Sequence, residues 1–475
     1  MSSIADLLHS TDAVGLAAHV KAGDVSALEL LEASIARVDA TNPQFNYIAQ
    51  NCRDRALAQA KASPPNSPLA GVPFLVKDLG VNIAGVPTGS GCRFLGHVPA
   101  TSSTFISLAD AAGLITFGKT TTPEKGLTVT TESVATGLTR NPWNPQKTTG
   151  GSSGGSACAV AVGAVPLAQA SDGGGSVRVP ASCCGLFGLK TSRGLIPLGP
   201  GKIEDWNGLS GIGPISRSVR DAAAFLDIFA QPEAGARIIP SRPRSYLSSL
   251  AERPPRLRIA LMPLSFTGVA LDSDVSAALH DAANLLSSLG HTLSDATPAV
   301  DYFALNSANI TNIAVCVAHD LSTHAALIGK DPADDQLEPM TAAWNRMGKA
   351  RTGLDLQAAL RTFQIGAAAM DRFFADHDIL LTPTLAKPPV DLGLLSLSNP
   401  DQDEFGRTFG EFCPFASLAN LTGTPAITLP LGMSRDGLPI GIMAQGRFAS
   451  EMLLLQLAAE VEAAAPWKDR RPPIA

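Results

Sequence analysis

Apolar residues near the start of the chain recur at the spacing of one helix face. In residues 24–40, DVSALELLEASIARVDA, they lie mostly three or four positions apart. Ser26 precedes Glu29 by three residues, which matches a capping box and predicts where the helix begins. We therefore expect a layer of helices over about residues 1–60.

Short apolar runs alternate with helix-like segments through the first third of the chain. Residues 71–76, GVPFLV, are bounded by turn residues and predict a buried strand. This strand delivers Lys77 and Asp78 at its carboxyl end, where α/β sheets place their functional sites. A helix over 101–112 and a strand over 114–117 continue the α/β alternation.

The middle of the chain has a different composition. Between residues 150 and 194 Gly, Ala and Ser dominate, and two glycine clusters flank a small-residue helix and a short strand over 165–170. Small residues let backbone segments approach closely, and glycines adopt dihedral angles that other residues avoid. This segment therefore favours a site built from main-chain groups.

Alternation of strands and helices resumes beyond residue 254. Two apolar runs within 424–445 are joined by residues 434–437, SRDG, a turn typical of a hairpin. We find no internal repeat and no linker that requires separate domains. The remaining expected elements are strands over 256–262 and 379–381 and helices over 273–289, 304–328 and 353–375.

Composition describes a chain with an ample core, because 45% of the 475 residues are hydrophobic and 16% are charged. A net charge of -6 without a Lys/Arg run gives no basis for a nucleic acid partner. No apolar run approaches the ~20 residues that span a bilayer, and the first residues lack a signal-peptide pattern, so we expect a cytoplasmic protein without membrane attachment. The seven cysteines have no C-x-x-C spacing, which predicts reduced thiols and no metal site.

Two short motifs match known patterns in the wrong context. Residues 113–120, GLITFGKT, match the phosphate-binding P-loop, but the residues between the glycines are themselves strand-like. Residues 151–155, GSSGG, match the nucleophile elbow G-x-S-x-G, but a proline-broken loop precedes them where an elbow needs a buried strand. The histidines offer no partner for such an elbow, since they occupy ordinary helix or loop contexts. We set both motifs aside.

A longer constellation is more specific. It comprises GGSSGGS at 150–156, SDGGGSVRVP at 171–180 and GLFGLK at 185–190. These segments resemble the amidase signature family, and the resemblance extends to PFLVKD at 73–78, GKTTTP at 118–123, GPIS at 213–216 and NLTGTP at 420–425. It covers about residues 24–465, and within the family it is similar to the branch that includes hydrolases of the 6-aminohexanoate cyclic dimer.

The resemblance implies a catalytic set of Lys77, Ser152 after a cis peptide bond, and the nucleophile Ser176. The chemistry is coherent, because a serine hydroxyl needs a base, and a lysine serves as one only when it is neutral. Burial at a strand end lowers the pKa of a lysine from its reference of about 10.4. Ser152 can relay the proton, since a hydroxyl both donates and accepts.

The residues around the predicted nucleophile have supporting roles. Three consecutive glycines, Gly173, Gly174 and Gly175, can direct backbone N–H groups at one oxygen and form an oxyanion hole. Ser153 is expected to support the loop of Ser152. We expect Asp172 and Arg178 to order the glycine turn by hydrogen bonds, with a solvated salt bridge as the alternative. Gly173 departs from the residue more common in the family, which adds flexibility there.

The resemblance also implies the fold. We expect one large α/β domain over residues 1–475, with a central mixed, mostly parallel β-sheet covered by helices on both faces. Its expected parts are an N-terminal helical layer at about 1–60, a catalytic core at about 65–220, a variable substrate-pocket segment at about 230–375, and C-terminal strands and a helix at about 376–475.

The expected activity is hydrolysis of a small-molecule carboxamide through an acyl-Ser176 intermediate, without metal or cofactor. Variable loops around Trp206 (200–212) and Cys316 (313–319) are the expected pocket, with a mostly apolar lining. The alternatives are the amidase subunit of a tRNA-dependent amidotransferase and a non-catalytic scaffold, which would not need the three catalytic residues. The sequence leaves open linear against cyclic amides, esters, and the oligomeric state, for which a homodimer is one option.

Overall fold

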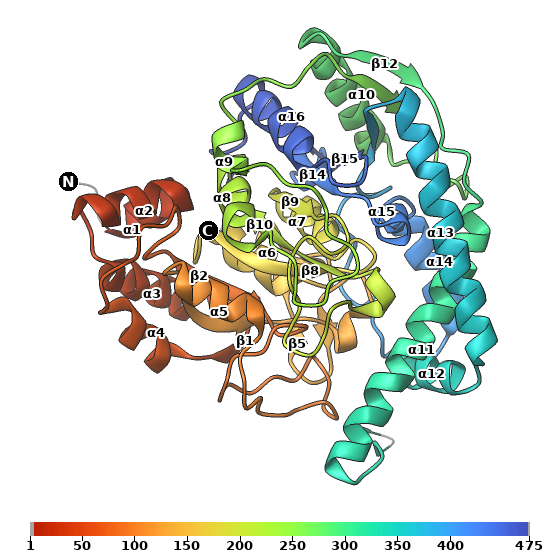
Figure 1. Cartoon of the computed structure of the whole chain (residues 1–475), viewed down its shortest axis with the longest axis horizontal. Helices are drawn as coiled ribbons and strands as arrows, with labels where there is room; N and C mark the ends of the chain where they lie inside the picture. Colours follow the sequence, from red (N-terminus) through yellow and green to blue (C-terminus); the bar gives the residue numbers. More distant parts are fainter. Residues whose placement is uncertain (1–3, 334, 474–475) are drawn as a thin grey trace.

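A broad mixed β-sheet crosses the middle of the protein, whose computed structural model describes residues 4–333 and 335–473 (Figure 1). Within these residues the sheet has 11 strands. In spatial order they are β1 (Ile48–Asn51), β3 (Ile115–Thr120), β2 (Pro73–Lys77), β8 (Leu167–Asp172), β10 (Gly211–Ser216), β9 (Phe187–Lys190), β14 (Ala426–Met433), β15 (Pro439–Gly446), β13 (Ile379–Pro383), β11 (Arg258–Leu261) and β12 (Thr292–Asp295). Two small hairpins pair β4 (Glu132–Ser133) with β5 (Gly137–Leu138) and β6 (Arg140–Asn141) with β7 (Asn144–Thr148).

The connections between strands decide their direction. Crossover helices α5 (Thr104–Ala111) and α10 (Ser273–Ser288) join β2 to β3 and β11 to β12, and both of these pairs are parallel. The central strands β14 and β15 are joined by the short turn that the sequence predicted, and a hairpin turn makes its two strands antiparallel. The sheet is therefore antiparallel at its centre and parallel on either side of it, while the edge pair β1–β3 is again antiparallel.

The predicted α/β fold with a mixed sheet is confirmed, but the expected majority of parallel pairs is wrong. Among the described strands, six of the ten neighbouring pairs in the large sheet are antiparallel. The other four are parallel. Helix-strand alternation predicts parallel pairs only where each helix crosses over between adjacent strands, and that condition fails at the centre of the sheet.

An N-terminal layer of helices packs beside the β1–β3–β2 edge, at the left of Figure 1. The capping box at its longest helix is confirmed, because Glu29 N–H donates to Ser26 Oγ at 3.1 Å and Ser26 N–H donates to Glu29 Oε2 at 2.8 Å. The helix continues five residues past the expected end at residue 40. The layer comprises α1 (Ile4–Ser10), α2 (Ala13–Ala22), α3 (Ala27–Phe45) and α4 (Arg53–Ala60).

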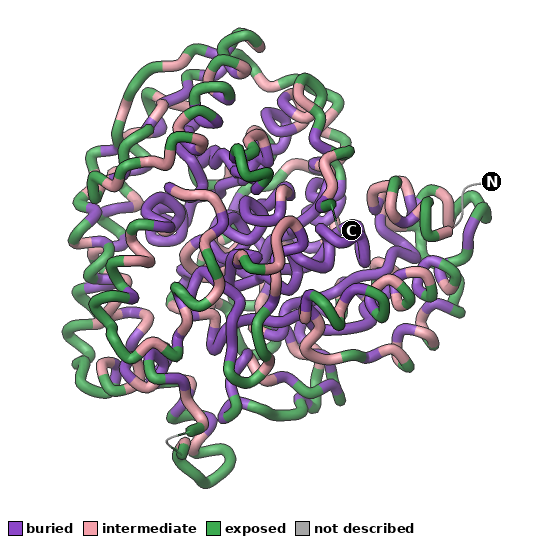
Figure 2. The backbone as a smooth tube through the Cα atoms, turned by 180° about the vertical axis from the view of Figure 1, so that it is seen from behind, coloured by how far each residue is buried: buried purple, intermediate pink, exposed green. Residues whose placement is uncertain are grey.

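Helices cover both faces of the sheet, as predicted. Alternate residues of β15 show this, because Ile440 and Ile442 pack into the apolar core shared with α10, α8 (Val219–Phe229) and α16 (Glu451–Ala464). Gly441, between them, donates its N–H to Ser182 Oγ of α7 (Arg178–Cys184) at 2.9 Å. The sheet is consequently buried on both sides, as the purple centre of Figure 2 shows.

The remaining helices complete the molecule. Long helices α11 (Tyr302–Ile328) and α13 (Gly353–Asp376) lie along one side, at the right of Figure 1, with α12 (Pro339–Lys349) packed against α11. No helix among the described residues is both long and apolar enough to cross a membrane. The others are α6 (Gly154–Ala161), α9 (Tyr246–Ser249), α14 (Gln402–Phe412), α15 (Ser417–Thr422) and the 3-10 turns η1 (Glu124–Gly126) and η2 (Trp206–Gly208).

Candidate active site

Lys77 occupies the position that the sequence predicted, at the carboxyl end of β2. Its side chain is fully buried, and Nζ donates to Ser152 Oγ at 2.6 Å and to Ser171 Oγ at 3.1 Å. Ser171 lies near the end of β8, which runs parallel to β2, so both strands bring their final residues to the same edge. The structure therefore joins three segments that are far apart in sequence.

The surroundings of Lys77 favour its neutral form. Burial lowers its pKa to about 7, and the nearby carboxylates of Asp172 and Asp205 only partly oppose that effect. A buried ammonium group loses its hydration, which disfavours the charged form. A neutral Lys77 is therefore accessible at neutral pH, unlike an exposed lysine, which stays charged there.

Ser152 lies in the loop between β7 and α6. The peptide bond from Gly151 to Ser152 is cis, as the sequence resemblance implied. The backbone there is enclosed, since a Cβ at Gly151 would lie 2.1 Å from Thr130 O. Ser153 Oγ donates to Ser171 O at 3.1 Å, which ties this loop to the end of β8.

A buried ion pair organises the glycine turn between β8 and α7. Asp172 Oδ1 accepts the Gly175 N–H at 2.7 Å, and Oδ2 accepts the Val177 N–H at 3.1 Å. Arg178 donates to the same carboxylate from Nε and Nη2, each at 3.0 Å, and neither side chain is exposed. Burial alone would raise the pKa of Asp172, but the Arg178 guanidinium holds it well below its usual range. This is the ordering contact that we expected, and not a solvated salt bridge.

The prediction for Gly175 as an oxyanion donor is wrong. Its N–H is engaged by Asp172, because the aspartate at the start of the turn captures the donor three residues later. Gly175 also has a φ of +130°. Within the described residues, the N–H groups of Gly173, Gly174 and Ser176 meet no protein acceptor, and a Cβ at Gly174 would meet open space. The Ser176 N–H is an unengaged group of the turn that the sequence prediction did not include.

Ser176 lies at the end of this turn, two residues before α7, and its side chain is largely buried. Gly150 of the Ser152 loop packs against the first turn of α7, where its Cβ would lie 2.9 Å from Pro180 Cα. The two serine segments therefore meet. Within the described residues Ser176 Oγ makes no hydrogen bond, including to Ser152, and such bonds often tighten only when substrate binds.

The structure connects the two residues expected in the pocket through Asn207, which follows Trp206 in the chain and contacts Cys316. The Trp206 ring packs against the glycine turn, 2.9 Å from a Cβ built on Gly173. Asn312 of α11 donates from Nδ2 to Trp206 O at 3.0 Å. The adjacent Asn207 donates from Nδ2 to Asn312 Oδ1 at 2.7 Å and to Cys316 Sγ at 3.6 Å. Helix α11 therefore holds the Trp206 loop beside the glycine turn.

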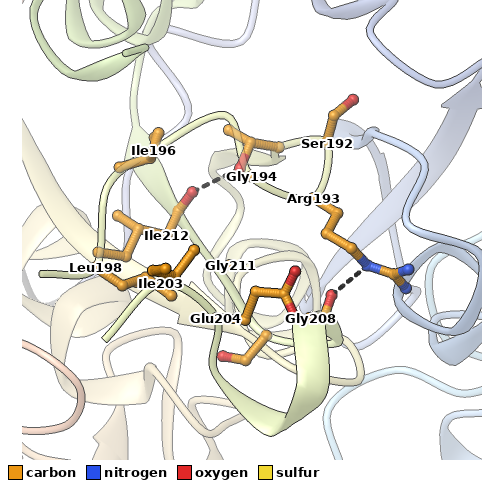
Figure 3. A pocket seen from close by; sticks show the side chains of 12 residues that line it. Ser192, Arg193, Gly194, Ile196, Leu198, Ile203, Glu204, Gly208, Gly211 and Ile212 are labelled. Atoms are coloured by element: carbon orange, nitrogen blue, oxygen red, sulfur yellow. Dashed lines mark hydrogen bonds between the residues drawn. The ribbon is translucent and has the colours of Figure 1, made fainter. Parts of the chain in front are cut away.

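A small pocket adjoins this loop (Figure 3). Arg193 crosses one side of it and donates from Nε to Gly208 O at 2.6 Å. On the other side of the pocket, the Thr191 hydroxyl donates to Ile212 O at 2.9 Å. Lys77, Ser152 and Ser176 do not line this pocket, so it is separate from the predicted catalytic residues.

Asn420 is a second residue whose role the sequence did not reveal. Its Nδ2 donates to Asp172 O at 2.8 Å and Oδ1 at 2.9 Å, and its Oδ1 accepts from Arg178 Nη2 at 2.7 Å. It thereby fixes the ion pair from helix α15, which is distant in sequence. The family-like segment at 420–425 was the available signal, but nothing local distinguishes this asparagine from a turn residue.

The two short motifs that we set aside have structural explanations. Residues 115–120 form β3, and within the P-loop match Lys119 is fully buried and pairs with Asp78 at 2.6 Å. The GSSGG segment follows β7, which belongs to a two-stranded hairpin and not to the central sheet. The P-loop match thus lies largely inside a strand, and the strand before GSSGG is not the buried central strand that a nucleophile elbow requires. Among the described residues, no group of three or more His, Cys, Asp and Glu side chains could hold a metal ion.

Comparison with known proteins shows that this fold, with its buried lysine beside serines, is that of a hydrolase of the amidase class. The family model described as Amidase matches residues 29–455, so the chain belongs to the amidase signature family. A 6-aminohexanoate-cyclic-dimer hydrolase from Paenarthrobacter ureafaciens is 37% identical, over 97% of this chain and 96% of that protein.

Solved structures agree with this assignment. A 6-aminohexanoate cyclic dimer hydrolase structure superposes with a TM-score of 0.92 at 35% identity, covering 100% of both chains. A bacterial aryl acylamidase of the amidase signature family superposes with a TM-score of 0.88 at 25% identity, covering 97% of this chain and 98% of the other. The chain is therefore an amidohydrolase that acts on a small-molecule amide.

Proposed function

We propose that Ser176 is the nucleophile of this amidohydrolase and that Lys77 activates it through Ser152. The observation that carries the proposal is the 2.6 Å hydrogen bond between Lys77 Nζ and Ser152 Oγ in a buried environment. Burial lowers the pKa of Lys77 to about 7, so a substantial fraction is ready to accept a proton at neutral pH.

In the acylation step, Ser176 Oγ forms a bond to the amide carbonyl carbon. Its proton passes to Ser152, whose own proton passes to Lys77 Nζ. The negative charge that develops on the carbonyl oxygen is stabilised by the N–H groups of Gly174 and Ser176, with Gly173 as a further donor. The C–N bond then breaks, and the leaving amine takes a proton from Lys77 through Ser152.

In the deacylation step, water attacks the acyl ester on Ser176. The water gives its proton to the same Ser152–Lys77 pair, the ester C–O bond breaks, and Ser176 regains a proton. Asp172 and Arg178 hold the glycine turn so that the donors keep their direction through both steps. Ser153 keeps the Ser152 loop against β8.

We further propose that Trp206 and Cys316 line the acyl or amine side of the substrate pocket, since the Trp206 ring packs against the glycine turn and Cys316 contacts the adjacent Asn207. Similarity to 6-aminohexanoate-cyclic-dimer hydrolases supports testing cyclic amides first. A cytoplasmic location, a homodimer and the four-part division of the domain stay predictions from the sequence.

The test is turnover of a panel of linear, aryl and cyclic amides, including glutamine, followed by mass spectrometry. Ser176→Ala should abolish turnover of every amide that the unmodified protein cleaves. Ser34→Ala is the matched control, because Ser34 is a buried serine whose hydroxyl has no hydrogen-bond partner, so turnover should persist.

Each outcome has a distinct meaning. Equal activity of the unmodified protein and Ser176→Ala would exclude Ser176 as the nucleophile. No turnover by any form would favour the amidotransferase-subunit alternative, which requires partner subunits for its reaction. Trapping a mass increase equal to the acyl group on Ser176 would support the acyl-enzyme directly.

A further inference from the structure

Helix α11 presents a polar stripe toward the predicted site. Asn312, Cys316 and Asp320 are spaced by four residues, so they lie on one face of the helix. Asn312 and Cys316 contact Asn207 of the Trp206 loop. Asp320, one turn further, pairs with Lys125 of η1 at 2.5 Å. One helix face therefore contacts two separate segments.

Both of these segments border the catalytic residues. Lys125 precedes Gly126, and a Cβ on Gly126 would lie 3.0 Å from Ser152 Oγ. Asp205 precedes Trp206, whose ring lies against the glycine turn. Lys125 is therefore adjacent in sequence to a residue that packs against Ser152, and Asp205 is adjacent to a residue that packs against the glycine turn. Asp205 is also near enough to Lys77 for its charge to oppose the burial that lowers the pKa of that lysine.

The charges in this region are paired. Lys202 pairs with Asp205 within the loop, and Lys125 pairs with Asp320 across the site. We call these four residues the charged rim. Lys202 and Asp320 keep exposed fractions of 47% and 34%, so the rim reaches solvent, whereas Lys125 is only 10% exposed.

Cys316 lies between the two pairs, because it contacts Asn207, two residues after Asp205, and precedes Asp320 by one helical turn. Burial raises the pKa of its thiol to about 12, and the carboxylates of Asp320 and Asp205 act in the same direction. The two lysines oppose them, so all four charges of the rim act on this one thiol. The rim is therefore a local cluster with two positive and two negative charges.

We propose that the charged rim selects amides without a net charge near the scissile bond, because every rim charge is already neutralised by a neighbour. This inference rests on the proposed function of Ser176. A charged group on a substrate must give up water, and it finds no free counter-charge at the rim to compensate for that loss. Removing one aspartate would leave its lysine free to attract a carboxylate.

The test uses three fluorophosphonate probes with tails of equal length that end in a methyl, a carboxylate or an ammonium group. Such probes form a covalent bond to an activated serine as fluoride leaves, so labelling of Ser176 requires no amide turnover. The labelling rate of each probe is followed by intact-protein mass spectrometry, and Ser176→Ala identifies the labelled residue. Thermal unfolding of each variant confirms that it is folded.

The unmodified protein should react fastest with the neutral tail. Asp320→Asn frees Lys125, and Asp205→Asn frees Lys202, so each should raise the carboxylate-to-neutral rate ratio by about tenfold, the effect of one unpaired charge a few ångströms away. Both should lower the ammonium-to-neutral ratio. Asp371→Asn is the matched control, since Asp371 forms an exposed pair with Arg447 at 2.8 Å that lies outside the rim, and its ratios should not change.

Two results would overturn the rim's role in selectivity while leaving the proposed function intact. One is labelling of Ser176 with unchanged rate ratios in both rim variants. The other is an equal slowing for all three tails, which would show that the pairs only hold the loop in place. Failure of every probe to label Ser176 would instead overturn the proposed nucleophile, and this inference with it.

Discussion

A carboxylate placed beside Lys77 should displace the pH dependence of activity to alkaline pH. Ser171 is the residue to change, because its hydroxyl lies 3.1 Å from Lys77 Nζ and is not part of the proposed proton relay. Ser171→Asp introduces a negative charge there, whereas Ser171→Asn has nearly the same shape without the charge. Comparison of the two variants isolates the electrostatic effect.

The magnitude follows from Coulomb's law. Two unit charges about 4 Å apart interact by about 4 kcal/mol at an effective dielectric constant of about 20, which corresponds to about three pKa units. The pKa of Lys77, which burial lowers to about 7, should rise by that amount in Ser171→Asp. At pH 7 the neutral fraction of Lys77 would then fall roughly 500-fold.

The sign of the effect is set by the role of Lys77 as a base. Only the neutral form accepts a proton, so activity is lost as the pH falls through the pKa of Lys77. For the unmodified protein the acidic limb of kcat/KM should therefore lie near pH 7. Ser171→Asp should lose activity at neutral pH and recover it at alkaline pH, while Ser171→Asn should keep the original midpoint.

The assay is kcat/KM measured from mildly acidic to strongly alkaline pH with an amide that the unmodified protein cleaves. Thermal unfolding at each pH separates loss of activity from loss of fold. Superimposable pH profiles for Ser171→Asp and Ser171→Asn would refute the assignment of Lys77 as the titrating base. If the acidic limb of the pH profile of the unmodified protein lay far from pH 7, the inferred effect of burial on the pKa of Lys77 would be refuted.

Three further substitutions test the residues that hold the glycine turn and the Trp206 loop in place. Arg178→Met should lower the free energy of unfolding, measured by urea denaturation, by about 3 to 5 kcal/mol, because it leaves Asp172 charged and buried. A decrease in the free energy of unfolding as small as that for breaking an exposed ion pair would contradict this prediction. Gly175→Ala should cost about 1 to 3 kcal/mol and lower kcat more than it changes KM, since the φ of +130° and the contact with Ala416 disfavour a Cβ; an unchanged kcat would show that the turn tolerates the strain. Asn312→Ala should raise KM severalfold with kcat nearly constant, because it releases the Trp206 loop from α11; a fall in kcat alone would place Asn312 closer to the reacting atoms.

Local elements were predictable because their causes are local. The capping box at Ser26, the buried strand before Lys77 and the hairpin turn at 434–437 each depend on residues within a few positions of one another. The placement of Lys77 at a strand end also followed, since a short apolar run bounded by turn residues is typical of a buried strand. The mostly parallel sheet was wrong because strand neighbours at the centre are chosen by packing between distant segments.

The sequence by itself determined the family, the α/β class, and the lysine and serines that meet in one place, because family-like motifs and short-range patterns carry that information. Only the tertiary structure decided which backbone N–H groups are engaged. Asp172 accepts a hydrogen bond from the Gly175 N–H but not from the Ser176 N–H, because the path of the turn sets the direction of each group. It also decided the pairing of Lys125 with Asp320 across 195 positions and the anchoring of Asp172 by Asn420, contacts that depend on long-range packing. Sequence spacing cannot fix such contacts, since they form only when distant elements pack and water is excluded between them.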